Sequence, residues 1–172
     1  MQSVSNDNFG PLIAYLIPGA SALVGLSQFS PALRTWLAVS PSDAPTIGGF
    51  LYLTLAALAV GMAVSAVRWA VIDAIHGRTG LAQPPLDFSK LGKNVEAFSL
   101  LIEIHYRHYQ FHANMFVAVA FSYCCMLLAA NPPGLLLTAS LLALQIVFFR
   151  TSRDNLRKYF TRTAQLLSAK PA

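Results

Sequence analysis

Charged side chains are scarce in this sequence: they make up 11% of its 172 residues, whereas 55% of the residues are hydrophobic. Soluble proteins carry about 25% charged residues on average. A soluble domain of this length could not bury so much apolar surface, so the composition argues against a soluble globular protein. The charges that are present fall into a few blocks, which leaves long apolar stretches between them.

Cysteines and catalytic motifs are also in short supply. The two cysteines, Cys124 and Cys125, are adjacent in an apolar stretch, and this spacing suits neither a zinc knuckle nor an ordinary disulfide. The sequence contains no G-x-x-x-x-G-K phosphate loop, no G-x-S-x-G elbow and no H-E-x-x-H motif. We therefore expect a non-enzymatic protein.

Four uncharged stretches reach or approach the roughly 20 residues that a helix needs to cross a bilayer. They are residues 9–29, 46–67, 113–130 and 134–149. The last stretch is short, but the long side chain of Arg150 at its end can reach the headgroups. The sequence predicts an all-α integral membrane protein with four transmembrane helices, forming a single membrane domain over residues 1–172.

Lys and Arg are missing from the first 33 residues. A cleavable signal peptide needs a basic region before its apolar core, so we expect the first helix to remain in the mature protein. The predicted outer loop, residues 30–45, contains only Arg34, and the turn at residues 131–133 contains no basic residue.

The other eleven basic residues lie in or beside residues 68–112 and 150–172. Because positive charge is retained on the cytoplasmic side, we expect both termini, the helical segment 68–112 and the basic tail 150–172 to be cytoplasmic. The expected location is a prokaryotic inner (plasma) membrane. Anionic lipid headgroups account for the basic residues, so nucleic acid is not an expected partner in spite of a pI near 9.5.

Three of the four histidines lie within eight positions, in the stretch EIHYRHYQFHANM. On a helix, His105, His108 and His112 share one face, with the one-turn spacing that zinc or iron ligands use. His76 is a candidate fourth ligand. The alternative interpretation is an interfacial belt of aromatic and amphipathic side chains at headgroup depth. We expect no cofactor, with zinc or iron at this cluster as the alternative.

A polar stripe follows another face of the same predicted helix, with Glu103 and Arg107 four residues apart and therefore placed to form an ion pair. If it is not simply an ion-paired surface, such a stripe in a bundle or oligomer could line an ion or proton pathway. Its members are Glu96, Glu103, Arg107, Gln110 and Asn114.

The basic tail is predicted to continue the fourth transmembrane helix as an amphipathic helix that binds headgroups or a partner protein. Its candidate binding residues are Arg150, Arg153, Arg157, Lys158 and Arg162. In the second helix, Ala57, Gly61 and Ser65 repeat every four residues, a spacing that lets two helix backbones approach closely. This stripe fits packing within a four-helix bundle or contact between subunits of a homo-oligomer.

Taken together, the sequence predicts a small, oligomeric membrane anchor, sensor or pore-forming component that receives a cytosolic protein partner or signal on its cytoplasmic face. The first alternative is a metal-dependent membrane enzyme or metal-handling protein that uses His105, His108 and His112. The second is an ion or proton transport component that uses Glu103 and Arg107.

Overall fold

The computed structural model describes residues 6–37 and 47–168, and these residues form helices and connecting segments with no β-strand among them. Parts of the predicted outer loop and the end of the predicted basic tail lie outside the described residues. The α-helices are α1 (Asn6–Leu26), α2 (Pro31–Leu37), α3 (Ile47–Arg68), α4 (Ala74–Arg78), α5 (Val95–Leu101), α6 (Arg107–Leu128) and α7 (Leu135–Ser168).

Four short helical segments join some of these helices. Two are π-helical turns, η1 (Trp69–Asp73) between α3 and α4 and η4 (Ile102–Tyr106) between α5 and α6. The other two are 3₁₀ turns, η2 (Phe88–Lys90) and η3 (Gly92–Asn94), which lead into α5. The π-turns interrupt the α-helical hydrogen bonding but not the helices, so α3 to α4 and α5 to α6 each form one long helix.

Three helices are long and apolar enough to cross a membrane: Gly48–Arg78, Val95–Leu128 and Leu135–Ser168. The second and third have 34 residues each, and all three run past the predicted spans at their basic ends. The first predicted span, residues 9–29, overlaps α1, of which Ile13–Leu26 is a shorter apolar helix, so the prediction of four spans is confirmed for three of them.

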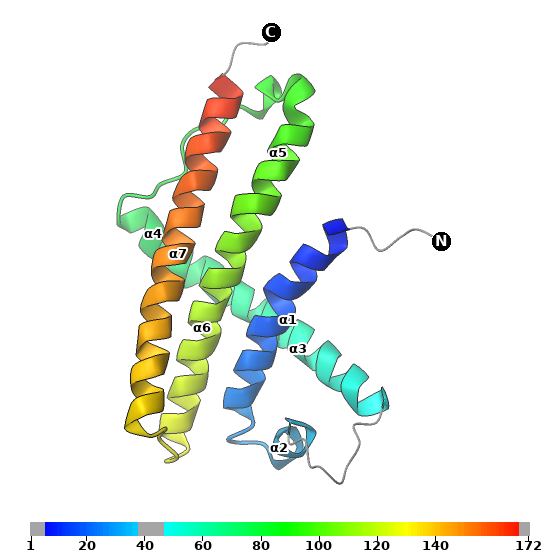
Figure 1. The fold of residues 1–172 in the computed structure, drawn as a ribbon, viewed down its shortest axis with the longest axis vertical. Helices are drawn as coiled ribbons and strands as arrows, with labels where there is room; N and C mark the ends of the chain where they lie inside the picture. Colours follow the sequence, from blue (N-terminus) through cyan, green and yellow to red (C-terminus); the bar gives the residue numbers. More distant parts are fainter. Residues whose placement is uncertain (1–5, 38–46, 169–172) are drawn as a thin grey trace.

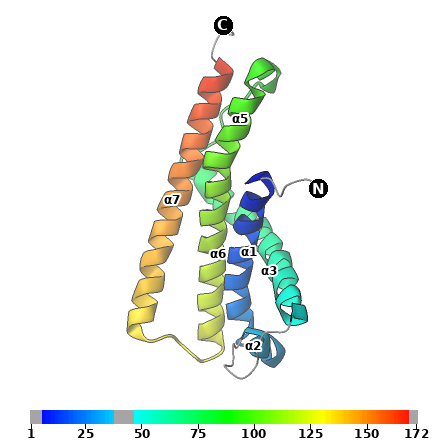
Figure 2. The same ribbon diagram turned by 45° about the vertical axis from the view of Figure 1, so that its right-hand side comes forward.

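The helix α6 lies at the centre of the molecule, between α7 on one side and α1 on the other (Figures 1 and 2). The helix α3 crosses α1 and α6 at a steep angle (Figure 1). In both views α5 and the last part of α7 lie side by side and extend well past the start of α1. We call this extension, Val95–Tyr106 together with Arg157–Ser168, the helical hairpin.

Glycines let α1 and α3 touch through their backbones. A Cβ atom added at Gly19 would lie 1.7 Å from the carbonyl oxygen of Ala57, and one added at Gly61 would lie 2.0 Å from that of Tyr15. Neither position has room for a methyl group, because real Cβ atoms do not approach closer than 3.0 Å. The small-residue stripe at Ala57 and Gly61 is thus occupied by α1 of the same chain.

Side-chain hydrogen bonds hold α1 to α6 across the same region. The Ser122 hydroxyl donates to the carbonyl oxygen of Ser21 at 2.6 Å, and the buried Asn114 amide donates to that of Ala14 at 3.0 Å. Both acceptors are carbonyl oxygens of α1 that also take part in the backbone hydrogen bonding of that helix. These bonds fix the register between the two helices.

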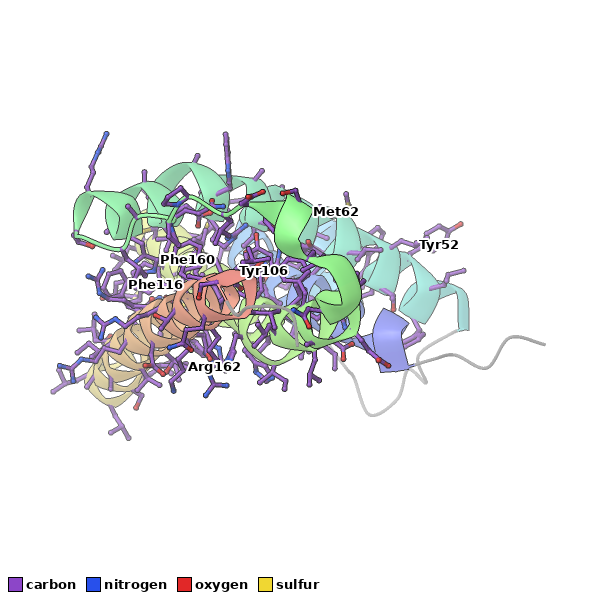
Figure 3. The ribbon with its side chains drawn as sticks, turned by 90° about the horizontal axis from the view of Figure 1, so that it is seen from above. Tyr52, Met62, Tyr106, Phe116, Phe160 and Arg162 are labelled. Atoms are coloured by element: carbon purple, nitrogen blue, oxygen red, sulfur yellow. The ribbon has the colours of Figure 1, made fainter. Side chains whose placement is uncertain are left out.

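The outer faces of the long helices are apolar and exposed. Tyr52 and Met62 on α3 are 66% and 61% exposed, and Leu136 on α7 is 84% exposed. Viewed along the long axis, Tyr52 lies far from the centre, whereas Tyr106 and Phe160 lie where the helices meet (Figure 3). An apolar exterior of this kind is what lipid contact requires.

Candidate functional site

A π-turn brings two opposite charges together at the basic end of α3. In an α-helix, with about 3.6 residues per turn, positions five apart point about 140° away from each other. A π-turn is closed by i→i+5 hydrogen bonds, so residues five apart lie on nearly the same side. Across η1, Arg68 Nη1 lies 3.1 Å from Asp73 Oδ1. The ion pair therefore depends on the π-turn.

Tyr109 of α6 supports this ion pair from the neighbouring helix. Its hydroxyl donates a short hydrogen bond to Asp73 Oδ1, and the guanidinium carbon of Arg68 lies 5.2 Å from the centre of its ring. Arg68 is 4% exposed and Tyr109 is 1% exposed. A charge buried as that of Arg68 is expensive to form without a partner and, near a membrane, is a functional-site candidate by default.

His76 of α4 extends the polar contacts to α7. Its Nε2 lies 3.3 Å from Ser152 Oγ, and Ser152 itself donates to the carbonyl oxygen of Phe149 at 2.9 Å. Because the hydroxyl proton is used in that bond, Nε2 is the donor in its contact with Ser152. His76 is fully buried, and its ring packs 5.2 Å from the ring of Phe149.

We call Arg68, Asp73, His76, Tyr109 and Ser152 the junction cluster. These five residues come from the α3–η1–α4 helix, from α6 and from α7. The cluster therefore links all three long helices at one level, at the base of the helical hairpin. Four of its members are buried, and the fifth, Asp73, has a side chain that is 32% exposed.

A cleft of about 410 Å³ opens beside the junction cluster. Asp73 and Tyr109 form part of its wall, and the rings of Tyr106, Tyr159 and Trp69 form much of the rest. Tyr106 and Tyr159 come from different helices, and their ring centres are 5.1 Å apart. A cleft of this volume falls in the range of small-molecule sites, and it combines aromatic surface with a few polar groups as such sites do.

A second cavity, of about 400 Å³, lies on the other side of α6, against α1. Glu103 and Arg107 line it and form an ion pair of 2.9 Å. His108 and His112 line it as well, with stacked rings 6.3 Å apart. His112 Nδ1 donates to the carbonyl oxygen of His108 at 2.6 Å, so one nitrogen of His112 is already used by the backbone.

The structure does not gather the four candidate metal ligands. His105 is buried within the hairpin, where its Nε2 accepts a hydrogen bond of 2.7 Å from Arg162 Nη1. An arginine only donates, so this imidazole is neutral and carries its proton on Nδ1. His76 lies in the junction cluster, and His108 and His112 lie at the second cavity. The described part of the chain holds no group of three or more His, Cys, Asp or Glu side chains placed to bind one metal ion.

Most of the predicted polar stripe faces the first half of α1. Glu103 and Arg107 share their cavity with Ile13 and Ala14, and Asn114 bonds to Ala14. Gln110 lines a further cavity of about 380 Å³ together with Tyr15, Ser65 and Arg68. Glu96 lies apart from the others, exposed on α5.

The predicted basic residues of the tail have several different surroundings. Arg153 donates to the hydroxyl and the carbonyl oxygen of Thr79, at 2.5 and 2.6 Å, and so ties the end of α4 to α7. Lys158 pairs with Asp154 at 2.6 Å on the exposed surface. Arg150 and Arg157 are exposed, and Arg162 binds His105.

Sequence reasoning overlooked the junction cluster as a unit. It considered His76 only as a candidate metal ligand and did not connect it with Arg68, Asp73, Tyr109 or Ser152. A signal was present, because Arg68 and Asp73 are opposite charges at the end of an apolar helix. Their spacing of five does not indicate a pair on an ordinary α-helix, and the π-turn that makes them neighbours has no signature in the sequence.

No protein-family model, no curated protein and no solved structure matches this chain. The class that the structure defines is an all-helical protein with three helices suited to crossing a membrane.

Proposed function

We propose that this protein is a non-enzymatic integral membrane protein that presents its helical hairpin to the cytoplasm as a docking element for a cytosolic protein. In this proposal α1 is a fourth transmembrane helix and both termini are cytoplasmic. The observation that carries the proposal is the surplus length of two long helices, which are packed together at the same end of the molecule.

The surplus can be expressed as a length. A helix of 34 residues is about 51 Å long at 1.5 Å per residue, whereas the hydrocarbon core is about 30 Å thick. Roughly 20 Å of each helix must therefore lie outside the hydrocarbon. In α7 this excess begins near Arg150, where the charged residues appear.

The distribution of charge supports the orientation. The turn between α6 and α7 contains Asn131, Pro132 and Pro133 and no basic residue, whereas the hairpin contains Arg157, Lys158 and Arg162. This bias favours a cytoplasmic hairpin. A 21-residue α1 is about 32 Å long, enough for a fourth span, and an even number of spans places both termini on one side.

The surface of the hairpin supports docking of a protein. Leu100 and Ile104 lie about one turn apart on the hairpin and are 54% and 46% exposed. Outside the bilayer, such apolar side chains are not covered by lipid, and together with neighbouring basic residues they fit a protein contact.

Site-specific photo-crosslinking in intact cells tests this function. A photoreactive amino acid at Leu100 should crosslink to a discrete cytosolic protein, whereas the same amino acid at Leu142, 55% exposed in the apolar part of α7, should not. A Leu100 product that contains only lipid or a second copy of this chain would contradict the proposal. So would labelling of Ser168→Cys by a thiol reagent that cannot enter the cell, because it would place the hairpin outside.

A further inference from the structure

The cleft beside the junction cluster has a lining that selects for one sign of charge. Among the described residues that line it, Asp73 is the one charged side chain. The others are chiefly aromatic or small, with Gln83 adding an amide. No Lys, Arg or His is among these described lining residues, although the tail near them is rich in basic residues.

The aromatic rings form a connected wall. The ring centre of Tyr106 lies 5.1 Å from that of Tyr159 and 5.9 Å from that of Tyr109, and Phe160 follows at 5.9 Å from Tyr159. Figure 3 shows Tyr106 and Phe160 near the centre of the molecule, where α7 meets the α5–α6 helix. The face of an aromatic ring carries negative potential, so this wall attracts cations and not anions.

Asp73 keeps acceptor capacity on the side of the cleft. Its Oδ1 accepts from both Arg68 and Tyr109, whereas Oδ2 has only a longer contact of 3.3 Å with Arg68 Nη1. A carboxylate offers about four lone-pair sites, so Oδ2 can still accept a hydrogen bond from an N–H or pair with the charge of a quaternary ammonium group. Arg68, whose side chain is 5% exposed, is buried behind the carboxylate and is not part of the cleft lining.

We propose that this cleft binds an alkylammonium group, held by Asp73 Oδ2 and by the faces of Tyr106, Tyr159 and Trp69. Carboxylate and aromatic faces together are the groups that recognise organic ammonium ions in proteins. The cleft lies at the level where the apolar spans end and the charged residues begin. The ammonium group therefore belongs either to the headgroup of a lipid or to a small soluble amine. This site does not depend on whether the hairpin docks a partner.

The fluorescence of Trp69 can report the binding of an ammonium ion in the cleft. The chain has two tryptophans, Trp36 and Trp69, so a Trp36→Phe protein reports on the cleft alone. In detergent, this protein should show a saturable change in fluorescence on titration with choline. The uncharged choline isostere 3,3-dimethylbutan-1-ol, which has the same shape, should produce no comparable change. An equal response to both compounds, or no response in any condition, would overturn the proposal.

Nanodiscs distinguish the two sources of the ammonium group. The Trp69 emission in nanodiscs of phosphatidylcholine should differ from that in nanodiscs of phosphatidylglycerol if the ligand is a lipid headgroup. If the ligand is a soluble amine, choline should change the emission equally in both lipids. Either pattern supports an ammonium site and assigns its source.

Two variants test the named residues. Tyr159→Leu removes one aromatic face, keeps all five residues of the junction cluster and should weaken ammonium binding about fivefold or more. The double variant Arg68→Gln/Asp73→Asn removes both charges together, leaves neither unpaired and should abolish the choline response. Asp154→Asn, at the exposed pair with Lys158, is the matched control and should bind as the parent does. Binding that survives in both lining variants, with unfolding temperatures near that of the parent, would place the ligand elsewhere.

Discussion

The helix α6 is packed against its two sides in different ways. On the side of α1 the contacts are short and made by small residues: a Cβ atom added at Gly25 of α1 would lie 2.7 Å from Ser122 Cα of α6. The contact between α1 and α3, at Gly19 and Gly61, is equally close and belongs to the same tightly packed side. On the side of α7 the contacts are made by large rings and polar side chains, such as Phe116 with Phe149 at 5.6 Å. The helix α6 thus forms a tight interface with α1 and a side-chain-filled interface with α7.

The difference follows from what each interface has to bury. Inside lipid there is no hydrophobic driving force between helices, so close backbone packing by dispersion is the main source of attraction. At the basic ends of the helices, polar groups must be buried and each one needs a partner. The interface with α7 carries the junction cluster and the cleft, whereas the interface with α1 chiefly fixes the positions of the spans.

Asp73→Asn should break the side-chain-filled interface and have the largest effect. It leaves Arg68 buried without a counter-charge, and loss of one partner of a buried ion pair costs about 3–5 kcal/mol. We expect the free energy of unfolding, measured by SDS titration of the protein in mixed micelles, to fall by about 3 kcal/mol.

The matched control for this change is Asp154→Asn, since Asp154 and Lys158 are both about half exposed. An exposed pair contributes about 0–1 kcal/mol, so this variant should unfold almost as the parent does. Equal losses for the two variants would mean that the junction cluster is not structurally special.

Gly61→Ala should break the backbone contact between α1 and α3 on the tightly packed side of the molecule. The added methyl group would meet the carbonyl oxygen of Tyr15 at 2.0 Å, and helix backbones cannot move aside as a flexible side chain can. Overpacking of this kind costs about 1–3 kcal/mol, in spite of the better helix propensity of alanine.

Gly77→Ala is the control for Gly61→Ala, because a Cβ atom there meets no other atom within 4 Å. It should be neutral or should stabilise the protein by up to about 1 kcal/mol. The same SDS titration separates the two variants. A neutral Gly61→Ala would show that α1 and α3 are not in backbone contact.

The tight packing around α1 was partly predictable from the sequence, whereas the side-chain-filled interface between α6 and α7 was not. Uncharged runs marked the stretches that now form the three long helices, and the spacing of Ala57 and Gly61 indicated a close helix contact. The spacing did not say which helix would be the partner, because α1 carries its complementary Gly19 without a periodic motif. The ion pair of Glu103 and Arg107 follows from the i, i+4 rule alone.

The junction cluster and the cleft could not be read from the sequence, because their members come from separate helices. Asp73 and Tyr109 are 36 positions apart, and His76 and Ser152 are 76 apart. The two π-turns add a second obstacle, since each rotates all later residues relative to an ideal helix. The histidine cluster was expected on one helical face, but His105 binds α7 whereas His108 and His112 line the cavity beside α1.

Asn114→Ala tests the tight interface between α1 and α6 in a second way. It removes a polar contact, whereas Gly61→Ala adds volume. Asn114 is fully buried, and its amide bonds to the Ala14 carbonyl oxygen, whereas its own oxygen has no protein partner. Hydrogen bonds between membrane helices contribute about 0.6 kcal/mol on average and up to about 1.7 kcal/mol. We expect a loss near the upper value, about 1.5 kcal/mol, because a cavity is also left behind. Asn114→Asp should destabilise the protein more, and the reverse order would contradict this account.

Arg162→Met removes a hydrogen bond from the hairpin end of the side-chain-filled interface, and its expected effect on stability is the smallest of those predicted. Methionine keeps the apolar stem of arginine but cannot donate to His105 Nε2, which now receives a bond of 2.7 Å. Arg162 is exposed in the hairpin, so water can replace the lost donor, and we expect a loss of about 0.5 kcal/mol. Hydrogen exchange should accelerate for amides of Val95–Tyr106 and remain unchanged for those near Ala118, which is fully buried between the spans. Faster exchange at both places would mean that the hairpin and the spans unfold as one unit, and a docked partner could then act on the whole membrane domain through the hairpin.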